Sequence, residues 1–144
     1  MMPKIIPSIM ATSQKELDLQ LTIASKITKS VHLDIVDGKF APSKVLWFKF
    51  KLLKNLSYTA HLMVEQPEKW IKKHLEDFEL FLPHIEKLSN IDNYYTWISK
   101  HKKPFAFALL PETKVSTIKE FVLKAKFILV LTVHPGFYGS KFLP

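Results

Sequence analysis

The chain has 144 residues, of which 47% are hydrophobic and 24% are charged. This composition is typical of a protein with one globular core and excludes a disordered chain. All 21 basic residues are lysine, and the formal net charge of +8 is spread along the sequence. There is no recognised nucleic-acid-binding module, no cysteine, and no apolar run that approaches the ~18 residues of a membrane span. We therefore expect a cytoplasmic protein that binds neither nucleic acid nor membranes.

Strand-like and helix-like segments alternate along the chain. Apolar runs of strand length occur at residues 4–9, 30–36, 58–64, 78–85, 105–110 and 126–133. Apolar residues recur at helical spacing after Ser13, after Pro67, at 91–101 and at 115–125, and 47–56 has the weakest helical pattern. Strands that are apolar on both faces and separated by helices predict parallel β/α units.

Two architectures fit this pattern: an open doubly wound sheet and part of a closed β/α barrel. Polar residues favour the barrel, because they recur at or near the ends of the predicted strands, where barrels build active sites. These residues are Ser8, His32, Asp34, His61, His84 and the sequence HPGF at 134–137. No glycine-rich nucleotide loop follows the first strand. We predict a single β/α (TIM) barrel domain over residues 1–144, truncated at its C-terminal end, with about six of the eight units of a full barrel.

The polar residues belong to longer motifs. These are PSIMA at 7–11, HLDIVDGKFAP at 32–42, HLMVEQPEKWI at 61–71, HIE at 84–86, LLPET at 109–113 and TVHPGFYGSKFLP at 132–144. In order and spacing, the motifs resemble the ribulose-phosphate 3-epimerase family over essentially the whole chain. The resemblance implies an isomerase with a divalent metal ion that interconverts ribulose 5-phosphate and xylulose 5-phosphate in the pentose phosphate pathway.

The resemblance also assigns roles to individual residues. His32, Asp34 and His61 would hold one divalent ion, because two imidazoles and a carboxylate suit zinc, iron, manganese or cobalt. His32 and Asp34 lie two residues apart and so face the same way on one strand. Asp34 would also move the proton at carbon 3, while an aspartate on a seventh strand would serve the opposite face. The residues expected to contact the sugar phosphate are Ser8, His61, Met63, Gly136, Phe137, Tyr138 and Gly139.

Some alternatives stay open at this point. One is an epimerase of a related ketose phosphate such as allulose 6-phosphate, and another is a non-catalytic relative that keeps half of the site for a metal or a partner. Asp37 is expected to form a turn with Gly38 rather than to act as a catalyst. For His84 and Glu86, the sequence favours neither support of the site nor a purely structural role.

The barrel interpretation has a consequence for association. Six strands cannot close as eight do, so the first and sixth strands become edges. Exposed edges pair with other chains, and we expect the chain to self-associate, with a homo-oligomer as one form, to aggregate or to be loosely packed. The alternative is that the six units rearrange into an open sheet that is stable alone. Phe105, Phe107 and Phe127 are the aromatic residues expected either to be exposed by an incomplete barrel or to collapse against one another.

Overall fold

The computed structural model describes residues 5–135 and 139–143. The strands are β1 (Ser8–Ile9), β2 (Ser30–Asp37), β3 (Lys44–Val45), β4 (Ser57–Met63), β5 (Leu80–Pro83), β6 (Ala106–Leu109) and β7 (Phe127–Val130). The α-helices are α1 (Gln14–Ser25), α2 (Pro67–Lys73) and α3 (Ile91–Lys100), and two short 3-10 helices are η1 (Ile85–Lys87) and η2 (Val115–Ile118). In these described ranges, no helix has the length and apolar character required to cross a bilayer.

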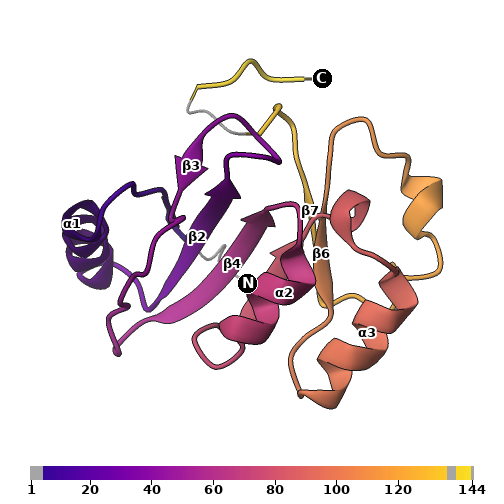
Figure 1. The fold of residues 1–144 in the computed structure, drawn as a ribbon, viewed down its shortest axis with the longest axis horizontal. Helices are drawn as coiled ribbons and strands as arrows, with labels where there is room; N and C mark the ends of the chain where they lie inside the picture. Colours follow the sequence, from indigo (N-terminus) through magenta and orange to yellow (C-terminus); the bar gives the residue numbers. More distant parts are fainter. Residues whose placement is uncertain (1–4, 136–138, 144) are drawn as a thin grey trace.

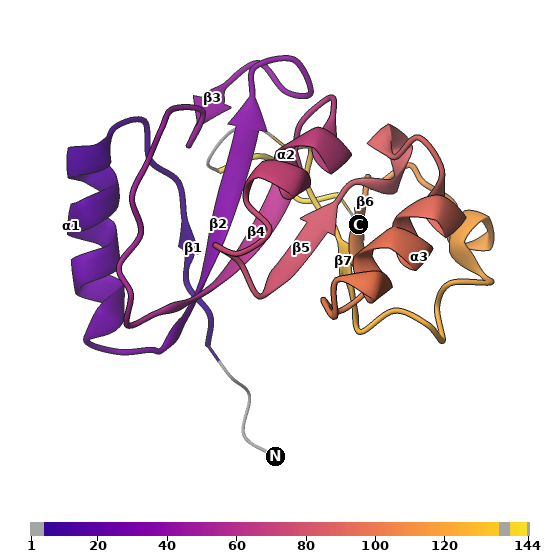
Figure 2. The same ribbon diagram turned by 60° about the horizontal axis from the view of Figure 1, so that its bottom comes forward.

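The strands lie side by side in chain order. β1, β2, β4 and β5 form one parallel sheet, β3 adds an antiparallel edge to β2, and β6 pairs in parallel with β7. A single bridge between His84 and Ala108 joins β5 to β6 (Figure 1 and Figure 2). This arrangement confirms the predicted parallel α/β class and is that of part of a β/α barrel. In the described part of the chain, β1 and β7 do not pair with each other, so the barrel is not closed.

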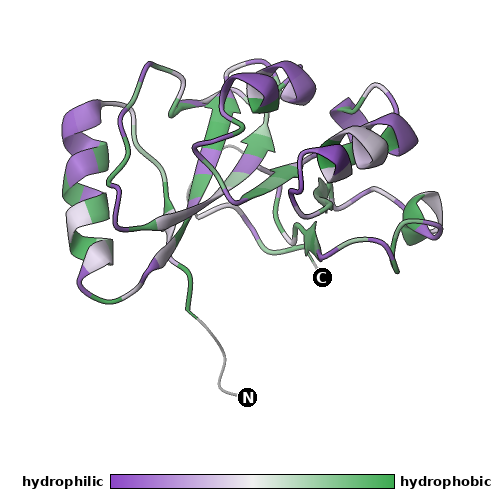
Figure 3. Ribbon diagram, turned by 90° about the horizontal axis from the view of Figure 1, so that it is seen from below, coloured by the Kyte–Doolittle hydropathy of each residue, from purple (hydrophilic) through white to green (hydrophobic). Residues whose placement is uncertain are grey.

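The first helix shows how the sequence determines its elements. The side chain of Ser13 accepts a hydrogen bond from the backbone N–H of Glu16, and the Glu16 carboxylate accepts one from the N–H of Thr12. This reciprocal pair fixes the start of α1. Leu17 and Leu21 are fully buried on its inner face. Figure 3 shows how hydrophobic and hydrophilic residues are divided in the rest of the molecule. The strands are mostly hydrophobic, and hydrophilic residues occupy only part of the central sheet.

The weak helical pattern at 47–56 was misleading, because this segment has no regular structure. Leu46, just before it, has a positive φ of 48°, which is a poor start for a helix. Phe48 and Phe50 lie two residues apart in this irregular segment, and both pack against the core. The phenol of Tyr58 donates a hydrogen bond to the carbonyl of Leu53 and ties the end of the segment to β4.

The predicted helix at 115–125 was also wrong in type and length. Only η2 forms, and turns follow it. Val115 and Val122, which were expected on a buried face, are exposed. The buried residues are Ile118, the last residue of η2, and Phe121, in the turns that follow it.

The outer edge of β7 confirms the predicted exposed strand. Phe127 and Val130 are 53% and 60% exposed, whereas Phe105 and Phe107 are buried with their ring centroids 5.4 Å apart, which agrees with the expected mutual collapse of aromatic rings. These two rings escape exposure because aromatic neighbours cover them, among them Phe121, whose ring centroid lies 6.1 Å from that of Phe105. The concave side of the sheet holds a cavity of about 540 Å³ that reaches from Ser8 to β7.

Replacing Val130 with lysine should therefore weaken self-association. A lysine on an exposed edge strand opposes strand pairing between chains. We expect the self-association constant to fall by about tenfold, or about 1.4 kcal/mol, in sedimentation experiments. Val115→Lys is the matched control, because Val115 is 67% exposed but lies outside any strand. Equal association of both variants and the wild type would contradict a role for the β7 edge.

Candidate active site

The candidate site lies on three neighbouring parallel strands, β1, β2 and β4. In the sheet register, Ser8 of β1 pairs with His32 of β2, and Asp34 of β2 pairs with His61 of β4. Alternation along β2 places His32 and Asp34 on the same face, as predicted. They lie within β2, which continues to Asp37, rather than at its C-terminal end. The register brings Ser8, His32, Asp34 and His61 together.

The Asp34 carboxylate is the centre of this group. One of its oxygens, Oδ2, accepts a hydrogen bond of 2.5 Å from the Ser8 hydroxyl. The other oxygen, Oδ1, lies 2.9 Å from His61 Nδ1 and 3.3 Å from His32 Nε2. The two imidazole rings are 5.6 Å apart between centroids. Asp34 is thus held from three sides by side chains of three strands.

These contacts determine the protonation of the group. Burial alone would raise the pKa of Asp34, but hydrogen bonds from His32 and His61, the charge interaction with His61 and the hydrogen bond from Ser8 together hold it well below its usual value. Burial lowers the pKa of His61, and this effect exceeds the opposing influence of Asp34. At neutral pH the site therefore offers an ionised carboxylate beside a neutral imidazole.

A second layer of polar residues, His84 and Glu86, lies behind His61, and of the two only His84 is buried. His61 Nε2 is 2.9 Å from Nε2 of His84, which is completely buried. His84 Nδ1 lies 3.3 Å from Glu86 Oε2, without the geometry of a hydrogen bond. The sequence left His84 and Glu86 undecided between support and structure, and the structure places both behind the site. Their signal was the pattern of a histidine and a glutamate two residues apart directly after a buried strand.

Glu86 is anchored by residues that follow β6, which the sequence did not identify as part of the site. Its Oε1 accepts hydrogen bonds from the Leu110 N–H, at 2.9 Å, and from the Thr113 hydroxyl. Burial would raise the pKa of Glu86, but the nearby His84 imidazole and these two donors lower it to about 2. Glu86 is therefore an ionised carboxylate at neutral pH.

The other residues expected to contact substrate have different surroundings. Met63 is buried near the C-terminal end of β4, two residues after His61 and on the same face. Gly139 is exposed and has a positive φ of 70°, which suits glycine. A side-chain carbon placed at Gly139 would meet no other part of the protein within 4 Å, so this position faces open space. Gly136, Phe137 and Tyr138 lie outside the described residues.

Asp37 has the structural role that the sequence predicted. One of its oxygens accepts hydrogen bonds from the backbone N–H groups of Lys39 and Phe40. The other accepts one from the N–H of Glu65, just after β4. Gly38 completes the turn with a φ of 78°. Asp37 thus ties the turn after β2 to the end of β4, beside the site but outside the Asp34 group.

The side chains of the central group fit a divalent metal ion. One ligand atom each from His32, Asp34 and His61 lie within 4.8 Å of one another. The carboxylate is ionised and the buried imidazole of His61 is neutral, and these are the forms that a metal requires. Nitrogen and oxygen donors of this kind bind zinc, iron and manganese. These three residues could therefore hold one metal ion.

Comparison with known proteins agrees with this geometry. The sequence model of the ribulose-phosphate 3 epimerase family matches residues 4–144. The chain belongs to this family. Its relatives named ribulose-phosphate 3-epimerase include those of Aquifex aeolicus (30% identity, 78% of this chain, 53% of the relative) and Eremothecium gossypii (29% identity, 99% and 66%). The relative from Bacillus subtilis is 25% identical over 99% of this chain and 68% of its own length.

The chain therefore spans only about half to two thirds of the length of these ribulose-phosphate 3-epimerases. The matched part contains every motif on which the resemblance rests and all four residues of the Asp34 group.

Proposed function

We propose that this chain carries the metal-binding and first proton-transfer part of a ribulose-phosphate 3-epimerase site. The substrate would be ribulose 5-phosphate, and the reaction would invert carbon 3 to give xylulose 5-phosphate. The observation that carries the proposal is the position of the Asp34 carboxylate. It lies between His32 and His61, in the one group of possible metal ligands within the described residues.

The reaction begins with removal of the proton on carbon 3, which is adjacent to the ketone. A metal ion held by His32, Asp34 and His61 would supply positive charge where negative charge develops on the substrate oxygens. Asp34, ionised at neutral pH, would accept the proton. Its low pKa makes it a weak base, so the step depends on strong stabilisation of the enediolate.

The neighbours of Asp34 restrict its movement during this step. The Ser8 hydroxyl holds Oδ2, and the two imidazoles lie against Oδ1. A carboxylate held in this way loses little freedom when it meets the substrate. Return of a proton on the opposite face requires a second acid, and the ligand group of the described residues contains no second carboxylate.

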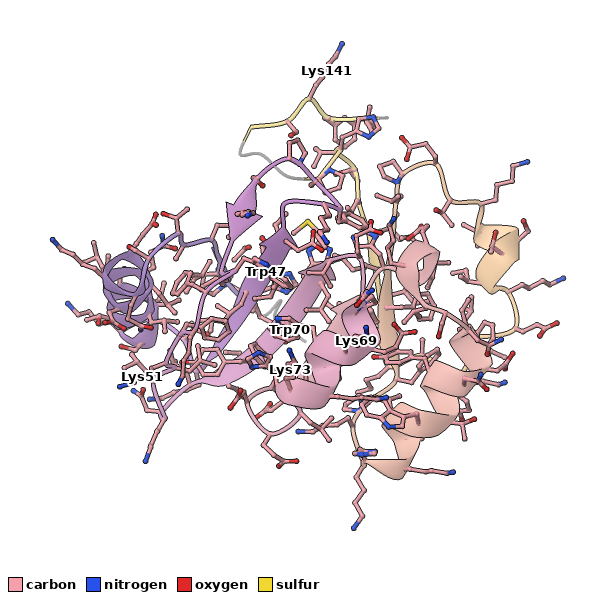
Figure 4. All side chains as sticks on the ribbon, viewed as in Figure 1. Trp47, Lys51, Lys69, Trp70, Lys73 and Lys141 are labelled. Atoms are coloured by element: carbon pink, nitrogen blue, oxygen red, sulfur yellow. The ribbon has the colours of Figure 1, made fainter. Side chains whose placement is uncertain are left out.

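The surface charge is consistent with a phosphorylated substrate. The net charge of +8 attracts anions over the whole molecule. Figure 4 shows Lys69 and Lys73 on α2, near Trp47 and Trp70. These four residues line a cavity of about 290 Å³ together with Asp37, Lys39, Glu65 and Gln66. Three lysines and two acidic residues give the lining only a small excess of positive charge.

Exchange of the carbon 3 hydrogen tests the proposal. The chain and zinc are incubated with ribulose 5-phosphate in deuterated water, and the carbon 3 proton signal is followed by NMR. We expect this signal to disappear faster with the chain than with zinc alone, with little net conversion to xylulose 5-phosphate. A zinc-loaded chain that causes no exchange above the zinc background would contradict the proposed function.

A further inference from the structure

Two buried histidines lie in a row between two carboxylates. Asp34 Oδ1 is 2.9 Å from His61 Nδ1, and His61 Nε2 is 2.9 Å from His84 Nε2. At the other end, His84 Nδ1 is 3.3 Å from Glu86 Oε2. His61 and His84 are 3% and 0% exposed, so water does not compete for the contact between them, whereas the Glu86 end of the row is accessible to solvent. We call His61 and His84 the histidine pair.

The histidine pair has too few protons for its contacts. A neutral imidazole has one proton on its two nitrogens, so the neutral pair has two protons. The row has three contacts, each of which needs one proton, and the carboxylates at both ends can only accept. One contact is therefore left without a hydrogen bond. In agreement with this count, His84 Nδ1 is a buried nitrogen without a hydrogen-bond partner.

A cation between Asp34 and His61 would remove this deficit. It would take the place of a proton at His61 Nδ1 and leave two protons for the two remaining contacts. His61 would then donate from Nε2 to His84 Nε2, and His84 would donate from Nδ1 to Glu86. Metal-binding histidines commonly donate their other N–H to a partner of this kind, which fixes the tautomer and the ring orientation.

We infer that His84 and Glu86 are positioning residues, which hold the proton of His61 on Nε2 and keep Nδ1 free for the metal. This inference rests on the metal site of the proposed function. The Glu86 carboxylate determines the direction of hydrogen-bond donation along the row. A carboxylate can only accept, so it requires the proton of His84 to be on Nδ1. The Leu110 N–H and the Thr113 hydroxyl hold the carboxylate in place. The Phe40 ring covers His84, with 4.7 Å between ring centroids.

The variant Glu86→Gln reverses the direction of hydrogen-bond donation along the row, with almost no change in the shape of the side chain. The glutamine oxygen would keep the Leu110 N–H as its donor, so the amide N–H₂ would face His84 and donate to Nδ1. His84 would then donate from Nε2 to His61, and His61 would donate from Nδ1 to Asp34. Every contact is satisfied without a cation, and the nitrogen that should bind the metal carries a proton.

We therefore expect Glu86→Gln to bind zinc about 10- to 100-fold more weakly than the wild-type chain, which is the usual effect of losing an outer partner of a metal ligand. Zinc affinity is measured by competition with a chromogenic chelator. Glu76→Gln is the matched control, because it makes the same change of charge at an exposed glutamate after α2. Circular dichroism establishes that both variants are folded.

Nitrogen-15 NMR of the histidine rings provides a second measurement that a purely structural role would not affect. The zinc-loaded wild-type chain should show His61 bound through Nδ1 with its proton on Nε2. The zinc-free Glu86→Gln chain should show the proton of His61 on Nδ1. Binding of zinc through Nε2 of His61 would overturn the inference without any variant.

The outcomes separate this inference from the proposed function. Equal zinc affinity of the wild type and Glu86→Gln would overturn the positioning role and leave the metal site intact. A wild-type chain that binds no zinc would overturn the metal site and the positioning role together. Loss of affinity in Glu86→Gln but not in Glu76→Gln, with the expected tautomers, would support the inference.

Discussion

Replacing Asp34 with asparagine should abolish exchange of the carbon 3 hydrogen. Asparagine has almost the same shape as aspartate, but its amide cannot accept a proton from carbon. General bases contribute about 10²- to 10⁴-fold to such steps, so the exchange rate should fall by at least this factor. The rate is measured by NMR in deuterated water at saturating zinc, because Asp34 is also one of the proposed ligands.

The control for this experiment is Asp92→Asn, which makes the same change at an exposed residue in the first turn of α3. We expect it to retain the exchange rate of the wild type. Zinc binding is measured for both variants, so that loss of the base can be separated from loss of the metal. Wild-type exchange by an Asp34→Asn chain would show that another group removes the proton.

Removal of both imidazole ligands should eliminate specific metal binding. In the double variant His32→Ala/His61→Ala, only Asp34 remains of the proposed ligand set, and one carboxylate does not hold a transition metal against water. The loss of zinc affinity should exceed the roughly 10- to 100-fold effect expected for an outer partner. Binding is measured by isothermal titration with zinc.

The matched control is His74→Ala/His101→Ala, which removes two histidines at the C-terminal ends of α2 and α3, outside the proposed ligand group. Because His61 is buried, its loss also leaves a cavity and an unpaired His84. The single variant His32→Ala, at a partly exposed position, therefore accompanies the double variant and should show weaker binding in a chain with unchanged circular dichroism. Zinc binding that survives both variants would place the metal elsewhere.

The sequence predicted the parts of the site that depend on local geometry. The period of two along β2 places His32 and Asp34 on one face whatever the strand packs against. The contact between Asp34 and His61 also depends on the register between β2 and β4, which the residue pattern alone does not determine. That contact was predicted from the family resemblance.

The support behind the site could not be predicted in the same way. The contact between His84 and His61 requires β5 to lie beside β4, and the contact of Glu86 with Leu110 and Thr113 requires the chain after β6 to return to the same place. The helices expected at 47–56 and 115–125 do not form, and the reason is related. In such short segments, packing against the rest of the protein outweighs the apolar spacing.

The contact between the two sheets has a consequence for cooperativity. Apart from the bridge between His84 and Ala108, Glu86 connects the sheets through the chain after β6. Local unfolding of β6 and β7 would therefore release Glu86 and, through His84, the orientation of His61. By linkage, a ligand that requires this orientation must favour docking of the two sheets by the same free energy. A metal ion bound at Asp34 would thus stabilise the contact between the two sheets without touching it.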